Sequence, residues 1–252
     1  MNGVPDTPPV PPALRCVWRR SLLRVPGTED DTTTTVFWLQ GARWHADIRI
    51  PAGRPDFSGV KRLEDCSDAQ LAWLATQQGF AGVTTVDPRS QETNWLRIVD
   101  FQPPSALPDA GYTEFTQGML VETGVHADYV EHWHRVPATD NGCAVFRRLD
   151  SDTTELLMTA GAMVTSVRAR RESFGRQGWG HGALLRSQLD FEISCGVRNS
   201  RGWQVRHSTL PWREGQPVEV SLNELRDGSV RLTIDGQPSR WEVLEWMPPR
   251  RT

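Results

Sequence analysis

The stretch TVFWLQGA, residues 35–42, has the β-branched and aromatic composition of a strand that ends at a glycine turn, and it returns as ELLMTAGA at residues 155–162. Each copy is followed by another run typical of a strand. Two later pairs repeat in the same order: FAGVTT from Phe80 with FEISCG from Phe191, and WLRIVDFQPP from Trp95 with WQVRHSTLPW from Trp203. The offsets of 120, 111 and 108 residues are collinear, which indicates a tandem duplication.

A shorter motif extends this repeat to the beginning of each half. WRR at Trp18 is matched by WHR at Trp133, 115 residues later, and QGMLVETG is echoed by the late DGSVRLTIDG. We therefore expect a first barrel over residues 14–130 and a second over 131–247. The proline-rich residues 1–13 and the short segment 248–252 are predicted to be disordered tails.

The predicted fold class is mainly β, with two tandem antiparallel β-barrels of lipocalin-like form. Short strands separated by turn residues run through both halves, and two units are too few for an open solenoid. Each unit must then bury its own core, and a closed sheet does so without leaving free edges.

One short helix is expected at residues 68–78. Leu71, Leu74 and Ala75 have helical spacing, Ser67 is a suitable N-cap, and Gly79 is a suitable stop. The helix is expected either as a lid across a barrel mouth or as a helix packed outside the barrel. The corresponding place in the second half, residues 172–187, is rich in glycine and predicts a mobile loop without a helix.

Composition bounds the function. The 28 basic and 31 acidic residues are interspersed and give a net charge of −3, which argues against nucleic-acid binding. The four cysteines lie 50, 77 and 52 residues apart and are expected to be reduced thiols. Because no signal peptide or membrane span is recognisable, we expect a cytoplasmic protein.

The histidines are the first candidates for chemistry. His132 and His134 share one face of a strand, close to Glu122 and His126, but the spacing fits no recognised metal motif. The sequence also lacks a nucleophile elbow and a phosphate-binding loop with its lysine. We therefore predict no metal, no cofactor and no catalytic triad.

Several segments resemble those of a known family. They are FWLQGARWHADIRIP, GYTEF, LVETGVHADYVEHWHR and the FEISCG region with GWQVRHSTLPWREG, and together the resemblance spans about residues 16–246. The chain resembles the two-barrel, lipocalin-like (calycin-type) family whose founding fungal member is named for interacting with a casein kinase I. The resemblance implies a fold and carries no activity.

The polar faces of the strands are the candidate site. In WHADIRIP, strand alternation places Trp44, Ala46, Ile48 and Ile50 on one face and His45, Asp47 and Arg49 on the other. The polar face is either solvent-exposed or directed into a barrel, and of such faces we favour solvent for most and the interior for one or two. The predicted ligand-binding residues are Trp38, Trp44, Asp47, Arg49, Trp95, Arg97 and Glu122.

The favoured function is non-catalytic: binding of a small apolar or amphipathic ligand, or of a protein partner. The first barrel is the expected site, with Arg49 holding an anionic head group, because Met158 and Val164 replace Trp38 and Trp44 in the second half. The alternative is a cofactor-free hydratase, isomerase or cyclase, in which a buried carboxylate such as Asp47, Glu122 or Glu131 transfers protons.

Overall fold

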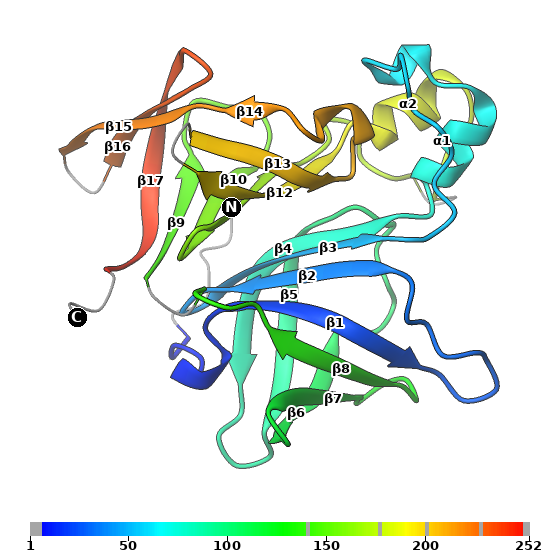
Figure 1. The fold of residues 1–252 in the computed structure, drawn as a ribbon, viewed down its shortest axis with the longest axis vertical. Helices are drawn as coiled ribbons and strands as arrows, with labels where there is room; N and C mark the ends of the chain where they lie inside the picture. The colour runs from blue at the N-terminus through cyan, green and yellow to red at the C-terminus, as the bar shows by residue number, and fades with distance from the viewer. Residues whose placement is uncertain (1–6, 140–141, 176–177, 200–201, 227–228, 249–252) are drawn as a thin grey trace.

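The computed structural model describes residues 7–139, 142–175, 178–199, 202–226 and 229–248, and it contains two β-barrels packed against each other (Figure 1). The first is closed: every strand pairs antiparallel with the next, and the last pairs with the first. Its strands are β1 (Val17–Arg24), β2 (Thr35–Gln40), β3 (Trp44–Ile50), β4 (Gln78–Val86), β5 (Glu92–Asp100), β6 (Ala110–Thr116), β7 (Met119–Gly124) and β8 (Val130–Arg135).

The second barrel is a nine-stranded antiparallel sheet in the order β14-β13-β12-β11-β10-β9-β17-β16-β15. Its strands are β9 (Cys143–Arg148), β10 (Glu155–Ala160), β11 (Met163–Arg168), β12 (Glu192–Asn199), β13 (Gly202–Ser208), β14 (Pro217–Val218), β15 (Val220–Arg226), β16 (Ser229–Ile234) and β17 (Gln237–Met247). The two end strands, β14 and β15, are consecutive in the chain and separated only by Glu219. One segment therefore joins both edges of the sheet and curls it into a barrel.

The duplication extends through the whole order of elements. Each half has three strands, a helix and then the remaining strands, so that α1 (Asp68–Leu74) corresponds to α2 (Ala183–Leu189). The start of the repeat differs from the sequence expectation. Trp133 lies on β8, which closes the first barrel against β1 with Trp133 opposite Arg20. The chain leaves the first barrel after Arg135, so residues 131–135 belong to the first unit.

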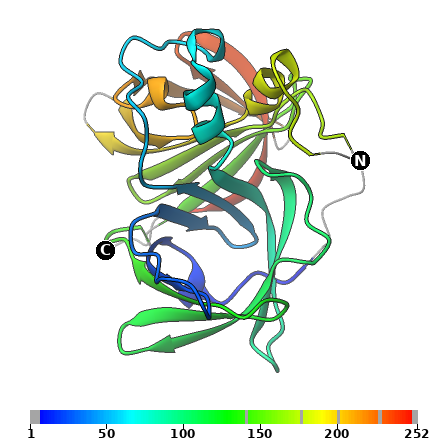
Figure 2. The ribbon, with the colours of Figure 1, turned by 90° about the vertical axis from the view of Figure 1, so that its right-hand side faces the viewer.

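Both helices lie outside the barrels (Figures 1 and 2). Ser67 and Gln70 form a capping box at the start of α1, as the N-cap pattern predicted. The helix ends at Leu74, earlier than expected, because β4 already begins at Gln78. Leu71 and Leu74 join the core between the barrels, so of the two expected placements the structure has the external one. The predicted loop at 172–187 was wrong in part, because α2 begins within it.

The core between the barrels is built from the outer faces of their sheets. On β3, Trp44, Ala46 and Ile48 point outward and pack in one cluster with Leu156 and Met158 of β10. The apolar face of β3 is therefore used for barrel association. Contacts of β2 with β10 and of β3 with β12 line this interface.

Polar contacts also hold the barrels together, among them those of Glu245 and Arg170. The carboxylate of Glu245, on β17, accepts hydrogen bonds from the backbone N–H groups of Ala42, Arg43 and Trp44 at 2.7, 2.5 and 3.0 Å. On the other side, the Arg170 guanidinium donates to the backbone oxygens of Asp100, Phe101 and Gln188. It lies over four aromatic rings, namely Phe101, Phe174, Trp179 and Phe191.

The described part of the N-terminal segment is ordered, unlike the predicted tail. Val10 is buried and its N–H donates to the oxygen of Ala42 at 2.7 Å, and a 3₁₀ helix, η1 (Pro12–Leu14), follows. The Trp18 indole N–H donates to the Leu14 oxygen at 2.8 Å, so this segment closes one end of the first barrel. Residues 1–6 and 249–252 lie outside the described residues.

The other short elements are η2 (Leu63–Asp65) and η3 (Pro211–Arg213). All four cysteines are buried, and none forms a disulfide bond. Within the described ranges, no helix has the length and apolar character needed to cross a membrane.

Candidate functional site

The interior of the first barrel is strongly charged. On β3, His45, Asp47 and Arg49 point inward, because the apolar alternate residues are taken up by the interface with the second barrel. The sequence left open which polar strand faces point inward, and β3 is one that does. Arg97 on β5, Glu122 on β7 and Glu131 on β8 also line the interior.

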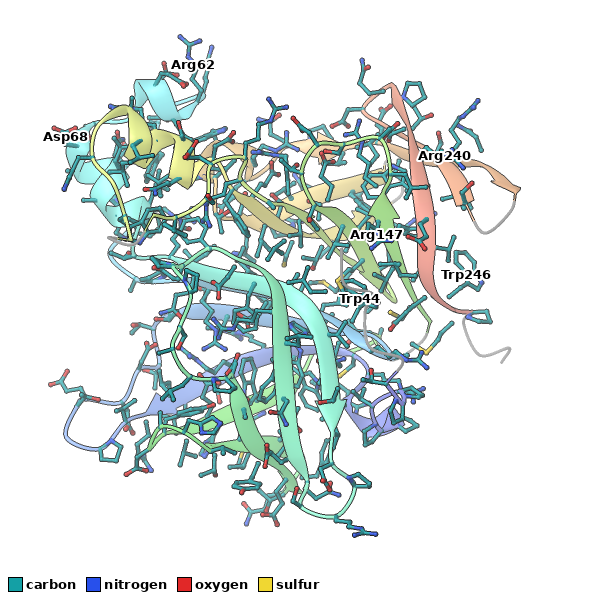
Figure 3. All side chains as sticks on the ribbon, turned by 180° about the vertical axis from the view of Figure 1, so that it is seen from behind. Trp44, Arg62, Asp68, Arg147, Arg240 and Trp246 are labelled. Atoms are coloured by element: carbon teal, nitrogen blue, oxygen red, sulfur yellow. The ribbon has the colours of Figure 1, made fainter. Side chains whose placement is uncertain are left out.

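These side chains surround a cavity of about 260 Å³. Its lining comes from seven strands and three loops: Leu23, Val25, Trp38, Asp47, Arg49, Phe80, Trp95, Arg97, Asp109, Glu122, Tyr129, Glu131 and Trp133. Six of the seven residues expected to bind ligand are among them. The exception is Trp44, which lies between the two barrels (Figure 3).

Arg49 is the centre of an ion-pair network. Its Nε donates to Asp47 Oδ1 at 2.8 Å and its Nη1 donates to Glu131 Oε1 at 3.2 Å. Arg20 donates to the same Glu131 oxygen at 2.5 Å and to Asp31 Oδ2 at 2.7 Å. The Arg49 guanidinium is thus already held by two carboxylates, which argues against its expected role of binding an anionic head group.

Arg97 is satisfied in a similar way. It donates to Asp109 Oδ2 at 2.7 Å and to Asp100 Oδ2 at 2.8 Å, and its guanidinium carbon lies 3.7 Å from the centre of the Phe80 ring. Neither arginine in the cavity lining lacks a carboxylate partner.

Glu122 is fully buried opposite these arginines. The Tyr129 hydroxyl donates to its Oε1 at 2.7 Å and the Trp133 indole N–H donates to its Oε2 at 3.1 Å. Burial, with a further contribution from the negative charge of Glu131, raises the pKa of Glu122 to about 8. Burial also raises the pKa of Asp47. At neutral pH the Glu122 carboxyl therefore holds its proton.

One fully buried carboxylate oxygen of the lining has no hydrogen-bond partner among the described residues. Glu131 is buried, and while its Oε1 accepts from two arginines, its Oε2 accepts from no described residue and has almost no exposed surface. A buried acceptor left unpaired is costly, by about 1–3 kcal/mol or more for a charged group. The polar lining of the cavity is incomplete at this atom.

Aromatic rings form the rest of the wall. Trp38 makes edge-on contacts with Trp95 and Trp133, each with ring centroids 5.6 Å apart, and it stacks on Trp18 at 6.3 Å. Trp18 adjoins η1, so the tryptophan cluster covers the closed end of the barrel. The opposite end of the cavity is bounded by the partly exposed Leu23 and Val25.

His45 is a buried neighbour of this site. Its Nδ1 lies 2.9 Å from Thr84 Oγ1, and burial lowers its pKa to about 3, so the ring is neutral. The other histidines considered for a metal lie elsewhere. His134 is exposed and contacts Ser21, and no group of three metal-ligating side chains occurs among the described residues.

Sequence reasoning missed several lining residues and misplaced others. Glu131 and Trp133 were assigned to the second barrel, and Tyr129, Phe80 and Asp109 were not considered. The sequence did contain a signal for three of them. Tyr129, Glu131 and Trp133 occupy alternate positions along the chain, as inward-facing residues of one strand do.

The second barrel has a smaller cavity of about 150 Å³. Its lining combines the charged side chains of Glu155, Arg168, Glu192 and Arg213 with apolar ones that include Trp203 and Trp241. The expectation that aromatic lining remains only in the first barrel was therefore wrong. Met158, which matches Trp38 in the sequence repeat, points outward into the interface.

Fold and site together define a two-barrel β protein in which one barrel encloses a charged, tryptophan-lined cavity. Among solved structures, the chain is similar to an uncharacterised protein of Saccharomyces cerevisiae, YLR301w, with 13% sequence identity and a TM-score of 0.61. The similarity covers 92% of this chain and 98% of the yeast chain. No family model matches the sequence, and no curated protein matches it. The two-barrel architecture implied by the family resemblance is confirmed, whereas membership of that family and a kinase partner are not supported.

Proposed function

We propose that this protein binds a small molecule in the cavity of the first barrel and does so without chemical conversion. The single observation that carries the proposal is the buried Oε2 atom of Glu131, a residue of the cavity lining, which has no hydrogen-bond donor among the described residues. A ligand that donates a hydrogen bond there would complete the lining.

Burying this many charged groups also lowers the stability that an interior with a purely structural role could reach. Burying ion pairs often costs more than it returns, and an apolar core of similar volume is commonly as stable or more stable. The second barrel is the internal comparison: four of the sixteen residues that line its cavity are charged, against six of the thirteen in the first barrel. The charged interior of the first barrel therefore supports a role in recognition.

The size of the cavity limits the ligand. Typical sites for drug-sized ligands measure about 300–1,000 Å³, and this cavity of about 260 Å³ lies just below that range. A compact molecule with a short apolar part fits such a space. The tryptophans would contact the apolar part and the carboxyl groups its polar end.

Two matched variants test this location. Leu23 lines the cavity, whereas its neighbour Leu22 does not. Leu23→Phe should fill the cavity and abolish binding of any small molecule that co-purifies with the protein or raises its melting temperature in a screen. Leu22→Phe should bind like the natural protein. Equal loss in both variants, or none in either, would contradict binding in this cavity.

An acid–base enzyme is the second candidate, and Glu122 is the observation that favours it. A buried carboxyl that faces a cavity with a pKa of about 8 is protonated at neutral pH and is suited to act as a general acid. In a cofactor-free isomerase or hydratase, Glu122 would deliver a proton and Asp47 would receive one. Mass spectrometry of bound molecules after incubation distinguishes the candidates, because a binding protein returns the ligand unchanged.

A further inference from the structure

The acidic groups outnumber the basic ones around the cavity of the first barrel. Four carboxyl groups line it, those of Asp47, Asp109, Glu122 and Glu131, against the guanidinium groups of Arg49 and Arg97. Four minus two leaves an excess of two carboxyl groups. The ion pairs immediately behind the lining add Arg20 with Asp31, and Asp100, so they do not reverse this excess.

The hydrogen-bonding groups of the lining also favour a ligand that donates hydrogen bonds. Arg49 and Arg97 each donate to two carboxylates, while the unpaired buried atom in the lining, Glu131 Oε2, is an acceptor. An anionic ligand would meet further carboxylates and compete with them for the arginines. A ligand that donates hydrogen bonds meets an acceptor that needs one.

The aromatic wall also suits a cation. Indole faces attract positive charge, most strongly when the cation is removed from water. The rings of this barrel already do so: the Arg49 guanidinium lies 6.0 Å from the centre of the Trp133 ring and 5.5 Å from that of Phe80. Trp38 and Trp95 line the same cavity.

We propose that the ligand of the first barrel is a small organic cation, an amine whose ammonium group donates to Glu131 Oε2 and to the Glu122 carboxylate while its apolar part lies against the tryptophans. This inference rests on the proposed binding function and names the chemical class of the ligand.

Binding should release one proton. The groups that face Glu122 are Tyr129, Glu131, Arg49 and Asp109, and Trp133 donates to it. Without a bound cation, Glu122 holds its proton because it is buried near another carboxylate. An entering ammonium supplies the missing positive charge, so the Glu122 proton leaves to solvent and the carboxylate forms. The affinity for an amine should therefore rise about tenfold per pH unit between about pH 6 and pH 8.

Calorimetric titration with ligands matched in shape tests the proposal. Each carbon skeleton, from butyl to octyl and including phenylethyl, is offered as the amine, the alcohol and the carboxylate. We expect at least one amine to bind at least tenfold more tightly than its alcohol at pH 7.5, and the carboxylate not to bind. If alcohols or carboxylates bind as tightly as the amines, the cation inference is overturned while the binding function stands. If no compound of any charge binds, the binding function itself is contradicted.

Glu122→Gln separates the carboxyl chemistry from the fold. The variant has the shape of the protonated residue, so it should remain folded but bind amines at least tenfold more weakly at pH 7.5, with no rise in affinity between pH 6 and 8. Glu114→Gln, at an exposed position on β6, should behave like the natural protein. Unchanged amine affinity and pH dependence in Glu122→Gln would refute the proposed contact.

Discussion

Replacing Glu122 by glutamine should make the stability of the protein less dependent on pH. The pKa of this carboxyl is raised from 4.5 to about 8 in the folded protein because the group is buried beside Glu131. Between these two values the folded chain keeps a proton that the unfolded chain has lost. The free energy of unfolding must therefore fall as the pH rises through this window.

The magnitude follows from the size of the shift. Each pH unit within the window lowers the free energy of unfolding by about 1.4 kcal/mol, so the interval from pH 5.5 to 7.5 costs about 2.7 kcal/mol through Glu122 alone. Glutamine carries no proton to lose. It should also fit the site, because its oxygen can accept from the Trp133 indole while its amide group donates to the Tyr129 hydroxyl.

Urea denaturation followed by tryptophan emission at both pH values measures the effect. We expect the natural protein to lose about 2.7 kcal/mol more than Glu122→Gln between pH 5.5 and 7.5. Glu114→Gln, at an exposed position, should follow the natural protein. Parallel stability curves for the natural protein and Glu122→Gln would show that Glu122 is ionised in the folded state and would refute the reasoning.

Three further substitutions test the contacts that hold the molecule together, each read as the free energy of unfolding. Arg170→Ala should lower the free energy of unfolding by about 3 kcal/mol or more, because three backbone oxygens and four aromatic rings lose their shared partner. Its control is Arg171→Ala, at an exposed position, which should lower it by less than about 0.5 kcal/mol. Glu245→Ala should also cost about 3 kcal/mol or more, since three backbone N–H groups of the other barrel lose their acceptor, and the more exposed Glu242→Ala serves as its control. Leu14→Ala should cost about 2–5 kcal/mol by leaving a void at the closed end of the first barrel, and a cost near zero would show that this segment is no part of the core.

Much of the fold could be predicted from the sequence because local patterns of turn residues and alternation indicate the strands of a barrel. The glycine turn after TVFWLQ and the alternation in WHADIRI predicted β2 and β3, and the structure has them at 35–40 and 44–50. Trp133 was assigned to the wrong barrel because WRR and WHR are too short to fix a register. Which strand closes a barrel depends on pairing with a segment more than a hundred residues away. Local sequence patterns do not predict such long-range pairing.

The site was harder to predict for a different reason. The alternation on β3 correctly separated Asp47 and Arg49 from Trp44 and Ile48, but an apolar face usually marks the inside of a barrel. Here it marks the interface between two barrels, so the polar face is the interior. Choosing between these arrangements requires knowing that the second barrel packs on this strand.

Strand β3 has no face in solvent, since six of its seven residues are buried and Arg49 is half-buried. A systematic substitution scan along it should therefore find damage at every position, but of two kinds that alternate residue by residue. Changes at 45, 47 and 49 should alter what the cavity accepts and how it responds to pH. Changes at 44, 46, 48 and 50 should instead loosen the attachment of one barrel to the other. Because one strand serves both purposes, selection for a different ligand can act on the odd positions while the even positions keep the two copies joined.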